Sequence, residues 1–550
     1  MIDSVNKYAS LTCDLRHFRS EKSKYIWFFA RLFVSLHLRM ILAVVLGYFA
    51  VLFAISRWTA RRQATNDTFY RGERRSPWYM VAFGMVGASI SGVTFVSVPG
   101  MVLTSGMSYL QVCLGFILGY LAVAFVLLPV YYRLNLTSIY TYLGQRMGPR
   151  SYKTGASFFL LSKMIGAAVK FYVVCMVLQQ FAASPDPSKG RGDLSFVLIT
   201  LGLVFLIWLY THRGGIRTLV FTDVFQTLCL FTALLLIIYN VLEAMDFSVG
   251  DAVRSIAADE RSRIFVLDDW GSPQNFWKQM LSGAFIVIVM TGLDQDMMQK
   301  NLTCRTLRDA QKNMCCYGVA FVPVNLLFLA LGILLAQFFQ THGTPLPAQG
   351  DELLPLFVEH GSMHNSQCIM HNSSFIPVLF VLGIVAASFS SADSALTSMT
   401  TSYCVDIRRR PADERLRRRT HVMMCLVFVL VILLIRAFNS TSLIDAIYTI
   451  VSYTYGPLLG LFAFGLFTHR EVRDRLVPYV CILSPLLCYA IDQLSRQLFD
   501  YRFGYELLLL NGLLTFIPLL LLSKTNEYEK TVFLHDAGTD SHSGHQGTAE

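Results

Sequence analysis

Charged side chains are scarce in this chain. Asp, Glu, Lys and Arg make up only 15% of its 550 residues, whereas soluble domains average about 25%. The sequence also has no GxSxG, HExxH or P-loop pattern, so nothing in it indicates a membrane enzyme. Its 12 cysteines are scattered and include no CxxC pair or metal-ligand spacing, which argues against a disulfide framework.

Long apolar runs are abundant instead. Hydrophobic residues make up 54% of the chain, and runs of membrane length recur along it with no βαβ or all-β pattern between them. We therefore predict an all-α membrane protein. The thirteen predicted spans lie near 40–56, 78–103, 109–131, 155–181, 195–211, 219–242, 277–297, 314–337, 375–402, 420–437, 443–467, 476–493 and 505–523.

The net charge of +10 is unevenly distributed between the loops. If the loop 57–77 is cytoplasmic, the segments on that side carry 28 Lys and Arg, and the loops on the other side carry 8. The loop 338–374 has none. This is the positive-inside pattern. It predicts a multi-pass plasma membrane protein, with a bacterial inner membrane favoured, an outside N-terminus, a cytoplasmic C-terminus and no nucleic-acid partner.

The two ends of the chain differ from the spans. Residues 1–39 carry seven Lys and Arg on the side predicted to be outside, so either they form an interfacial helix or translation starts at Met40. The polar residues 524–550 predict a disordered cytoplasmic tail. Histidines in this tail and at positions 360 and 364 are weak metal candidates, and we expect no metal there.

One predicted span carries an unusual number of hydroxyl groups. Between Gly383 and Ser402 there are nine hydroxyl side chains and one carboxylate, Asp393. At helical spacing, Ala387, Ser390 and Ser391 begin a stripe on one face. Polar groups in hydrocarbon are costly unless they are paired. The stripe therefore either packs against another helix or faces a cavity that holds an ion or a solute.

Two other spans carry helix breakers at their centres. The segment GASISG at 87–92 consists mostly of small or polar residues that form helices poorly, and Gly292 precedes Asp294 and Asp296 in the seventh span. Counted from the second span, these are helices one and six, and the hydroxyl-rich span is helix eight. Interrupted helices at matching positions of two halves are typical of transporters. Small-residue packing remains the alternative for the segment 87–92.

These features resemble the sodium:solute symporters, the family of sodium-coupled sugar, proline, sialic acid and monocarboxylate carriers. The match covers about residues 40–523, and its most specific part is Ala387-x-x-Ser390-Ser391 with Asp406-Ile407 fifteen residues later. The resemblance implies a LeuT-type 5+5 inverted-repeat core at 78–467, one leading helix at 40–56 and two trailing helices at 468–523. It implies sodium as the coupling ion and no other cofactor.

The resemblance also implies a set of sodium ligands. In the family, the first position of the motif gives a carbonyl oxygen and the two hydroxyl residues give side-chain oxygens. Aligning the break in helix one adds two further carbonyls. The implied sodium ligands are Gly87, Ile90, Ala387, Ser390 and Ser391.

The solute is less well determined. Val287 and Met290 stand where the sodium–sugar branch has Asn and Tyr, and Ser89 stands where the proline branch has Asp. Lys163 and Lys170 are seven residues apart on one face of the fourth span, where buried cations are costly. Either lysine is a candidate for binding a substrate carboxylate. The alternatives are that Lys163 snorkels and that Lys170 pairs with an internal acid or carbonyl.

The remaining solute candidates follow from position. Ser89, Ser91, Thr94 and Phe95 surround the break in helix one, Gln111 begins helix two, and Tyr453 and Tyr455 lie in helix ten.

We therefore expect a sodium-coupled secondary active symporter for a small polar organic solute. A carboxylate-bearing solute is favoured because of the two lysines. Two alternatives stay open. One is a proton-coupled carrier of the same fold that uses Asp393. The other is a non-transporting membrane sensor, which is disfavoured because a tail of this length is too short for a signalling domain.

Overall fold

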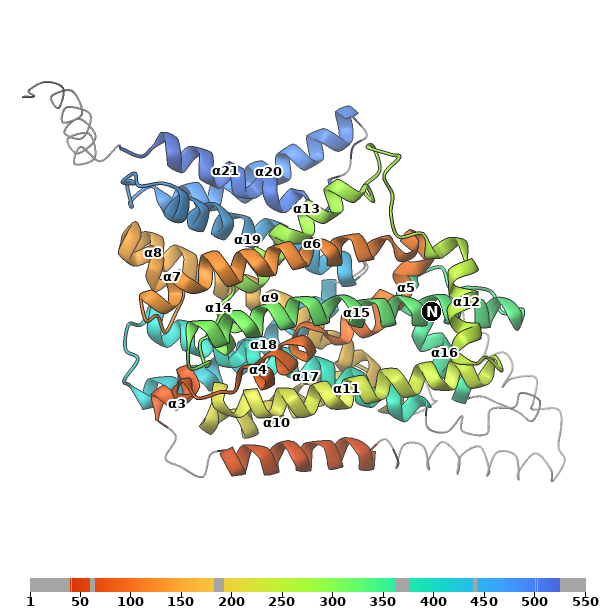
Figure 1. Ribbon diagram of the computed structural model, residues 1–550. Helices are drawn as coiled ribbons and strands as arrows, with labels where there is room; N and C mark the ends of the chain where they lie inside the picture. The colour runs from red at the N-terminus through yellow and green to blue at the C-terminus, as the bar shows by residue number, and fades with distance from the viewer. Residues whose placement is uncertain are drawn as a thin grey trace, which may run out of the picture.

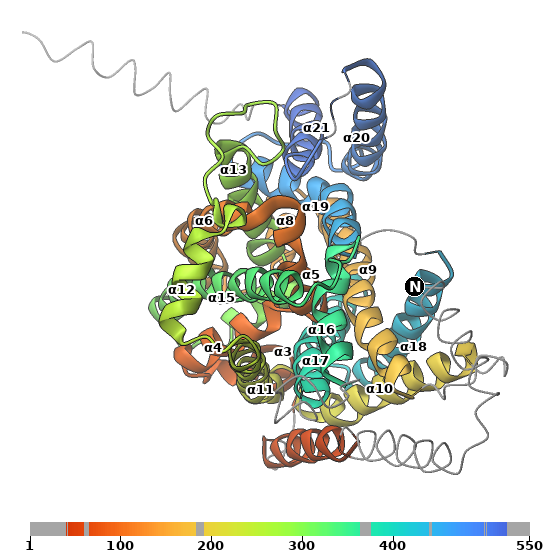
Figure 2. The same ribbon diagram turned by 90° about the vertical axis from the view of Figure 1, so that its right-hand side faces the viewer.

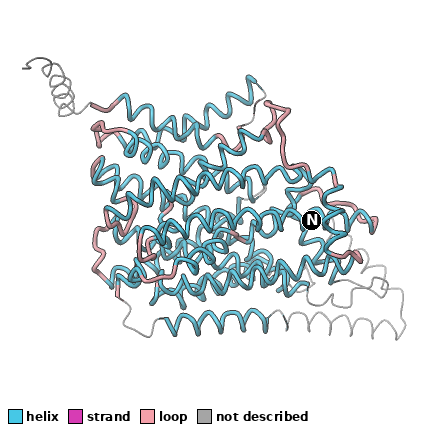
Figure 3. The backbone as a smooth tube through the Cα atoms, viewed as in Figure 1, coloured by secondary structure: helices cyan, strands magenta, loops and turns pink. Residues whose placement is uncertain are grey.

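The computed structural model describes residues 40, 42–59, 65–182, 192–362, 376–438, 443–499, 501 and 503–524. Over these ranges the chain forms helices and loops, and strand-like pairing is limited to two isolated bridges, Ser76 with Cys304 and Glu471 with Lys524 (Figure 3). The predictions for 1–39 and 525–550 lie outside what the structure describes, and so do His364 and the side chain of His360.

All thirteen predicted spans coincide with helices. The leading helix is Leu42–Thr59. The core helices are α4 (Trp78–Ser89), α5 (Gly92–Ser105), α6 (Tyr109–Ala122), α7 (Leu128–Arg133), α9 (Pro149–Ala182), α10 (Gly192–Gly214), α11 (Ile216–Ala244), α13 (Phe276–Val287), α14 (Gln295–Asn301), α15 (Leu307–Thr341), α17 (Ile376–Ser402), α18 (Glu414–Phe438) and α19 (Leu443–Phe467). The trailing helices are α20 (Val477–Phe499) and α21 (Leu507–Leu521).

Shorter elements connect these helices. They are α3 (Asn66–Arg71), α8 (Thr141–Arg146), α12 (Val249–Ala258), α16 (Leu353–Ser362) and the short turns η2 (Gly72–Arg74), η3 (Gly106–Ser108), η6 (Glu260–Ser262) and η8 (Gly350–Glu352). Three π-helical turns continue the longer helices: η4 (Val123–Leu127), η7 (Ile288–Gly292) and η10 (Tyr403–Ile407). By length and composition, nine of the described helices qualify as membrane-crossing, or ten if the bent pair α13–α14 is one span.

The first predicted interruption separates α4 from α5. Ile90 leaves the helix with φ −80° and ψ 113°. Ser91 then caps α5, because its hydroxyl accepts from the amide of Thr94 while the hydroxyl of Thr94 accepts from the amide of Ser91. The small and polar residues of the segment 87–92 thus end one helix and begin the next inside a single span, as their low helix propensity predicts.

The second interruption bends the seventh span. Phe276–Gly292 and Gln295–Asn301 meet at an angle of 70°. Asp294 caps the short α14 by accepting hydrogen bonds from the amides of Asp296 and Met297. The turn η7 at the end of α13 is held from α7, since the Tyr131 hydroxyl donates to the Gly292 carbonyl at 2.9 Å.

The long helices run roughly side by side, so the loops gather at two ends of the bundle (Figure 1). Viewed along the bundle, α5, α15 and α17 lie near its centre, the leading helix lies at one edge and α20 and α21 lie at the opposite edge (Figure 2). Helix α17 packs against α11 and α9, and α15 packs against α5. Helix α17 is the most buried of the described spans, with 83% of its apolar window inside the protein, which explains how it accommodates its polar residues.

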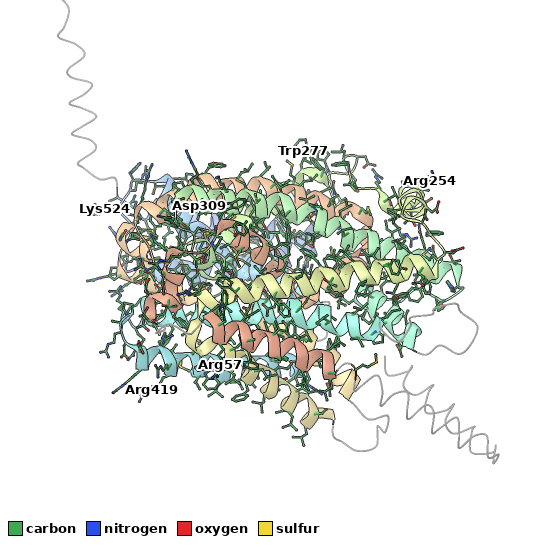
Figure 4. All side chains as sticks on the ribbon, turned by 60° about the horizontal axis from the view of Figure 1, so that its bottom comes forward. Arg57, Arg254, Trp277, Asp309, Arg419 and Lys524 are labelled. Carbon is green, nitrogen blue, oxygen red and sulfur yellow. The ribbon has the colours of Figure 1, made fainter. Side chains whose placement is uncertain are left out.

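Loops that the charge pattern places on one side contact each other. The Asn66 side chain donates to the Pro411 carbonyl at 2.7 Å, and the Arg150 amide donates to Asp474 at 2.9 Å. Lys524, Asp309 and Arg419 lie toward this end and Arg254 lies at the other (Figure 4). We call the end of the bundle toward which Lys524, Asp309 and Arg419 lie the basic end. Its grouping of loops agrees with the alternation that the sequence predicts.

Close helix packing depends on glycine at the centre of the bundle. A Cβ atom built on Gly87 of α4 would lie 1.9 Å from the Thr227 hydroxyl of α11. Only glycine lets the two helices approach this closely, and the contact fixes α4 beside α11 just before the break. Helix packing thus accounts for Gly87. The packing role that the sequence left open for the segment 87–92 therefore holds for this residue.

Candidate functional site

The break between α4 and α5 lies directly against α17. The Ser391 hydroxyl of α17 donates to the Ala88 carbonyl at 2.9 Å. Ala387, Ser390 and Ser391 are all buried there, with exposed fractions of 1%, 1% and 8%. The structure therefore brings together the two segments that the sequence predicts to share an ion.

The break also releases two carbonyl groups. In a continuous helix the amide of Ser91 would bond the carbonyl of Gly87, and the amide of Thr94 would bond the carbonyl of Ile90. Here both amides are used within the cap: the Ser91 amide donates to the Thr94 hydroxyl at 3.3 Å, and the Thr94 amide donates to the Ser91 hydroxyl at 3.4 Å. The Gly87 and Ile90 carbonyls are thus freed from the helical ladder.

The side chain of Ser390 is oriented by a carboxylate on α11. Its hydroxyl donates to Asp223 of α11 at 2.8 Å, and the other oxygen of Asp223 lies 2.8 Å from the ammonium of Lys300 on α14. Because the hydroxyl proton of Ser390 points to Asp223, the lone pairs of its oxygen are left for another partner. A serine that ligates a cation must be oriented in this way.

A cavity of about 110 Å³ lies on the other side of the break. Its polar lining comes from Ser89, Ser91, Thr94, Tyr109, Tyr120, Lys170, Thr291, Tyr317 and Asn325. Its apolar lining comes from Val93, Val98, Phe116, Ile286, Val287, Met290, Met297 and Phe321. The cavity thus joins α4, α5, α6, α9, the bend in the seventh span and α15, and it combines one cation with a largely apolar wall.

Four of the predicted solute residues line this cavity. They are Ser89, Ser91, Thr94 and Lys170, and Ser89 also hydrogen-bonds the Tyr317 hydroxyl. The position of Val287 and Met290 in the wall agrees with the alignment that placed them at the solute.

Phe95 and Gln111 lie elsewhere. Phe95 is fully buried and does not line the cavity, and its ring centroid is 5.5 Å from that of Phe328. Gln111 is buried under the loop before α13, where it accepts from the amide of Val266 at 3.0 Å and donates to the Gln274 carbonyl at 3.0 Å. Packing and loop anchoring account for these two residues, so we leave them out of the proposed solute site.

A second cavity of about 50 Å³ lies between the first cavity and the basic end. It shares Lys170, Met290 and Met297 with the first, and it reaches Ala88 and Ser391 at the predicted ion site. The two cavities and the ion site are therefore neighbours.

An ion-pair cluster lines the second cavity. The Lys163 ammonium lies 3.2 Å from Asp294 and 2.7 Å from Asp296, and the Tyr455 hydroxyl donates to Asp294 at 2.7 Å. The cluster ties α9 and α19 to the short helix α14. Lys163 therefore does not snorkel to the surface, because both of its partners are almost fully buried.

The other predicted lysine is in a different situation. Lys170 lines both cavities, and no ion pair to it is present among the described residues. Tyr453, by contrast, faces away from both cavities: its ring packs near Tyr489 of α20, and its carbonyl accepts from Asn511 of α21 at 3.0 Å. Of the two tyrosines predicted in helix ten, Tyr455 alone lines either cavity.

Several cavity residues were not singled out from the sequence. Tyr120, Tyr317 and Asn325 belong to spans that read as ordinary apolar helices, and no local signal distinguishes them. Asp223, which lies behind the ion site, did leave a signal. Asp223 is an acid inside the predicted span 219–242, and an intramembrane ionisable residue is by default a functional candidate.

Comparison with known proteins bears on the identity of the chain. The model of the "Sodium:solute symporter family" matches residues 69–474. The chain belongs to this family. Its members are transporters rather than enzymes.

Individual relatives are more distant. A sodium/sialic acid symporter of Proteus mirabilis is 26% identical over 463 residues, covering 78% of this chain and 84% of the relative. The human sodium/iodide cotransporter is 24% identical over 419 residues, covering 74% and 62%. Among solved structures, a substrate-bound, outward-open Na⁺-coupled sialic acid symporter superposes with a TM-score of 0.72 at 20% identity, covering 88% of this chain and 99% of that one. This likeness confirms the predicted LeuT-type fold.

Proposed function

We propose that this protein is a sodium-coupled symporter that imports a small carboxylate-bearing solute across the plasma membrane by alternating access. Sodium is held by the carbonyl oxygens of Gly87, Ile90 and Ala387 and by the hydroxyl oxygens of Ser390 and Ser391. The solute occupies the cavity of about 110 Å³. The basic end faces the cytoplasm, in keeping with the charge asymmetry of the loops.

One observation carries the sodium site. The break releases the carbonyls of Gly87 and Ile90, and beside it the Ser391 hydroxyl of α17 reaches across to the Ala88 carbonyl of α4. Oxygen donors are what a hard cation prefers, and neutral donors suffice for a monovalent ion when several converge. In this account sodium takes over the bridge between α4 and α17 that the hydrogen bond from Ser391 to Ala88 makes without it.

Lys170 supports an anionic solute. Its ammonium reaches the cavity without an ion-pair partner in the described part of the chain, so a solute carboxylate would supply the missing counter-charge. The relatives named above transport sialic acid, which bears a carboxylate, and iodide, which is also an anion. The small volume and the apolar wall around Val287 and Met290 favour a compact solute over a hexose.

The geometry gives a mechanism for coupling. Sodium joins α4 to α17 on one side of the break, and the cavity residues Ser89, Ser91 and Thr94 belong to the same segment. Binding the ion therefore orders part of the solute site. Opening of the basic end separates α9 and α19 from α14 at the Lys163 cluster, parts α4 from α17, and releases both ligands. The membrane potential contributes about 2.3 kcal/mol per charge per 100 mV.

Uptake into proteoliposomes tests this function. We expect a radiolabelled small monocarboxylate from a panel of aliphatic, hydroxy- and keto-acids to accumulate under an inward sodium gradient, and not when choline replaces sodium. The alanine variant of both serines, Ser390→Ala/Ser391→Ala, should lose this accumulation. Accumulation driven by a proton gradient in choline would contradict sodium coupling and favour the proton-coupled alternative. Sodium and solute binding without any accumulation would favour the sensor.

A further inference from the structure

A buried charge cluster lies directly behind the proposed sodium site. Lys300 of α14 and Asp223 of α11 are each only 1% exposed, and their ammonium nitrogen and carboxylate oxygen are 2.8 Å apart. Such a pair at the centre of a membrane bundle is costly to desolvate, and replacing it by apolar side chains is often neutral or stabilising. Its presence therefore calls for an explanation other than stability.

The cluster contains more oxygen than this ion pair uses. Asp393 of α17 is fully buried, and its Oδ2 accepts from the Tyr210 hydroxyl at 2.6 Å. Its Oδ1 and the hydroxyl of Ser394 have no hydrogen-bond partner in the described part of the chain. Asp393 and Ser394 follow Ser390 by three and four residues, so all three lie on the same face of α17.

The charges of this cluster act on one another. Lys300 interacts electrostatically with Asp223, Asp296 and Asp393, and the carboxylates of Asp223 and Asp393 repel each other. Carboxylate oxygens from α11 and α17, with the hydroxyl of Ser394 on the same face of α17, thus form one cluster with a single positive charge. This is the donor set that a hard monovalent cation requires, and the chain fills it with its own ammonium group.

We propose that Lys300 is an internal cation that occupies a second cation site behind Ser390 and thereby limits the protein to one bound sodium ion. The inference rests on the proposed function, because it takes the first sodium site as given. The ammonium supplies the one positive charge that Asp223 needs, and a sodium ion at the same oxygens would clash with it and add a second charge.

The same ammonium also positions the sodium ligand Ser390. Lys300 fixes one oxygen of Asp223, and the other oxygen of Asp223 takes the hydroxyl proton of Ser390. Lys300 is carried by α14, the short helix that Asp294 caps next to the Lys163 cluster. A single short helix therefore links the residues behind the ion site to the cluster that lines the second cavity.

Binding of radioactive ²²Na⁺ to the purified protein tests the proposal without a solute. We expect one sodium ion per wild-type chain at saturation. The variant Lys300→Ala leaves the carboxylate of Asp223 and opens the site, so it should bind two. The double variant Lys300→Ala/Asp223→Asn removes both charges and should return to one. Lys312→Ala is the matched control, because Lys312 is exposed on α15, and it should bind one.

The outcomes separate this inference from the proposed function. Two ions in the wild type, or one in a folded Lys300→Ala variant, would overturn the inference. Recovery of Lys300→Ala in sodium but not in choline would support it, because the entering ion replaces the lost charge. If Lys300→Ala folds in neither salt, the number of sodium ions bound by the wild type decides. No binding to the wild type would overturn the proposed sodium coupling, and one ion bound by Lys300→Ala would then still support the internal cation.

Discussion

The variant Lys163→Met is expected to unfold far more easily than the wild type. It leaves Asp294 and Asp296 without their cation, although both carboxylates are only 2–3% exposed. Leaving a buried charge unpaired costs about 3–5 kcal/mol. We therefore expect the free energy of unfolding to fall by about that amount, seen as a lower midpoint in thermal or denaturant unfolding in detergent.

A compensating variant separates lost pairing from lost packing. Lys163→Met/Asp294→Asn/Asp296→Asn removes the three charges together and should recover most of the stability, because no unpaired charge remains. The Tyr455 hydroxyl retains an acceptor at position 294 in that variant. An unchanged unfolding midpoint in Lys163→Met would show that the cluster does not hold α9, α14 and α19 together.

The variant Lys170→Met should keep its stability but bind the solute less tightly. Lys170 lies seven residues further along the same helix, lines the solute cavity and makes no ion pair among the described residues. Its removal takes away a half-buried charge that has no ion-pair partner among the described residues, so we expect stability to be unchanged or higher. Loss of one partner of a buried charge pair weakens binding by about 2–5 kcal/mol. The KM for solute uptake should therefore rise by about 30-fold to several thousand-fold.

The comparison of the two lysines has internal controls. Lys153→Met removes an exposed lysine from the same helix and should change neither stability nor uptake. Lys170→Arg keeps the positive charge and should retain part of the uptake. A Lys170→Met variant with wild-type KM would show that the solute carboxylate is not bound there.

The sequence predicted the helical spans and both interruptions because those depend on local chemistry. The segment 87–92 breaks its helix through its own small and polar side chains, and Asp294 caps α14 through its immediate neighbours. The hydroxyl-rich face of α17 was equally visible, since membrane helices without a polar partner do not carry such a stripe.

The pairing of individual side chains was not predictable in the same way. Lys163 and Lys170 share a helix face, yet Lys163 pairs with two carboxylates and Lys170 lines a cavity. The environment of each lysine depends on what α14 places opposite it. Thr94 and Phe95 are adjacent, but only Thr94 lines the cavity. Asp223 was overlooked as one acid in an apolar span, and its role became apparent only when α11, α14 and α17 were brought together.

The most direct test of sodium coupling is the thermal stability of the purified protein in sodium against choline. A ligand that binds only the folded state stabilises it by about 2.7 kcal/mol at one hundred times its Kd. We expect the wild type and the control variant Thr397→Val/Ser398→Ala, which removes two other hydroxyls of α17, to melt at higher temperature in sodium. Ser390→Ala/Ser391→Ala should melt at the same temperature in both salts. A wild type that shows no difference between the salts at high concentration would contradict the sodium site.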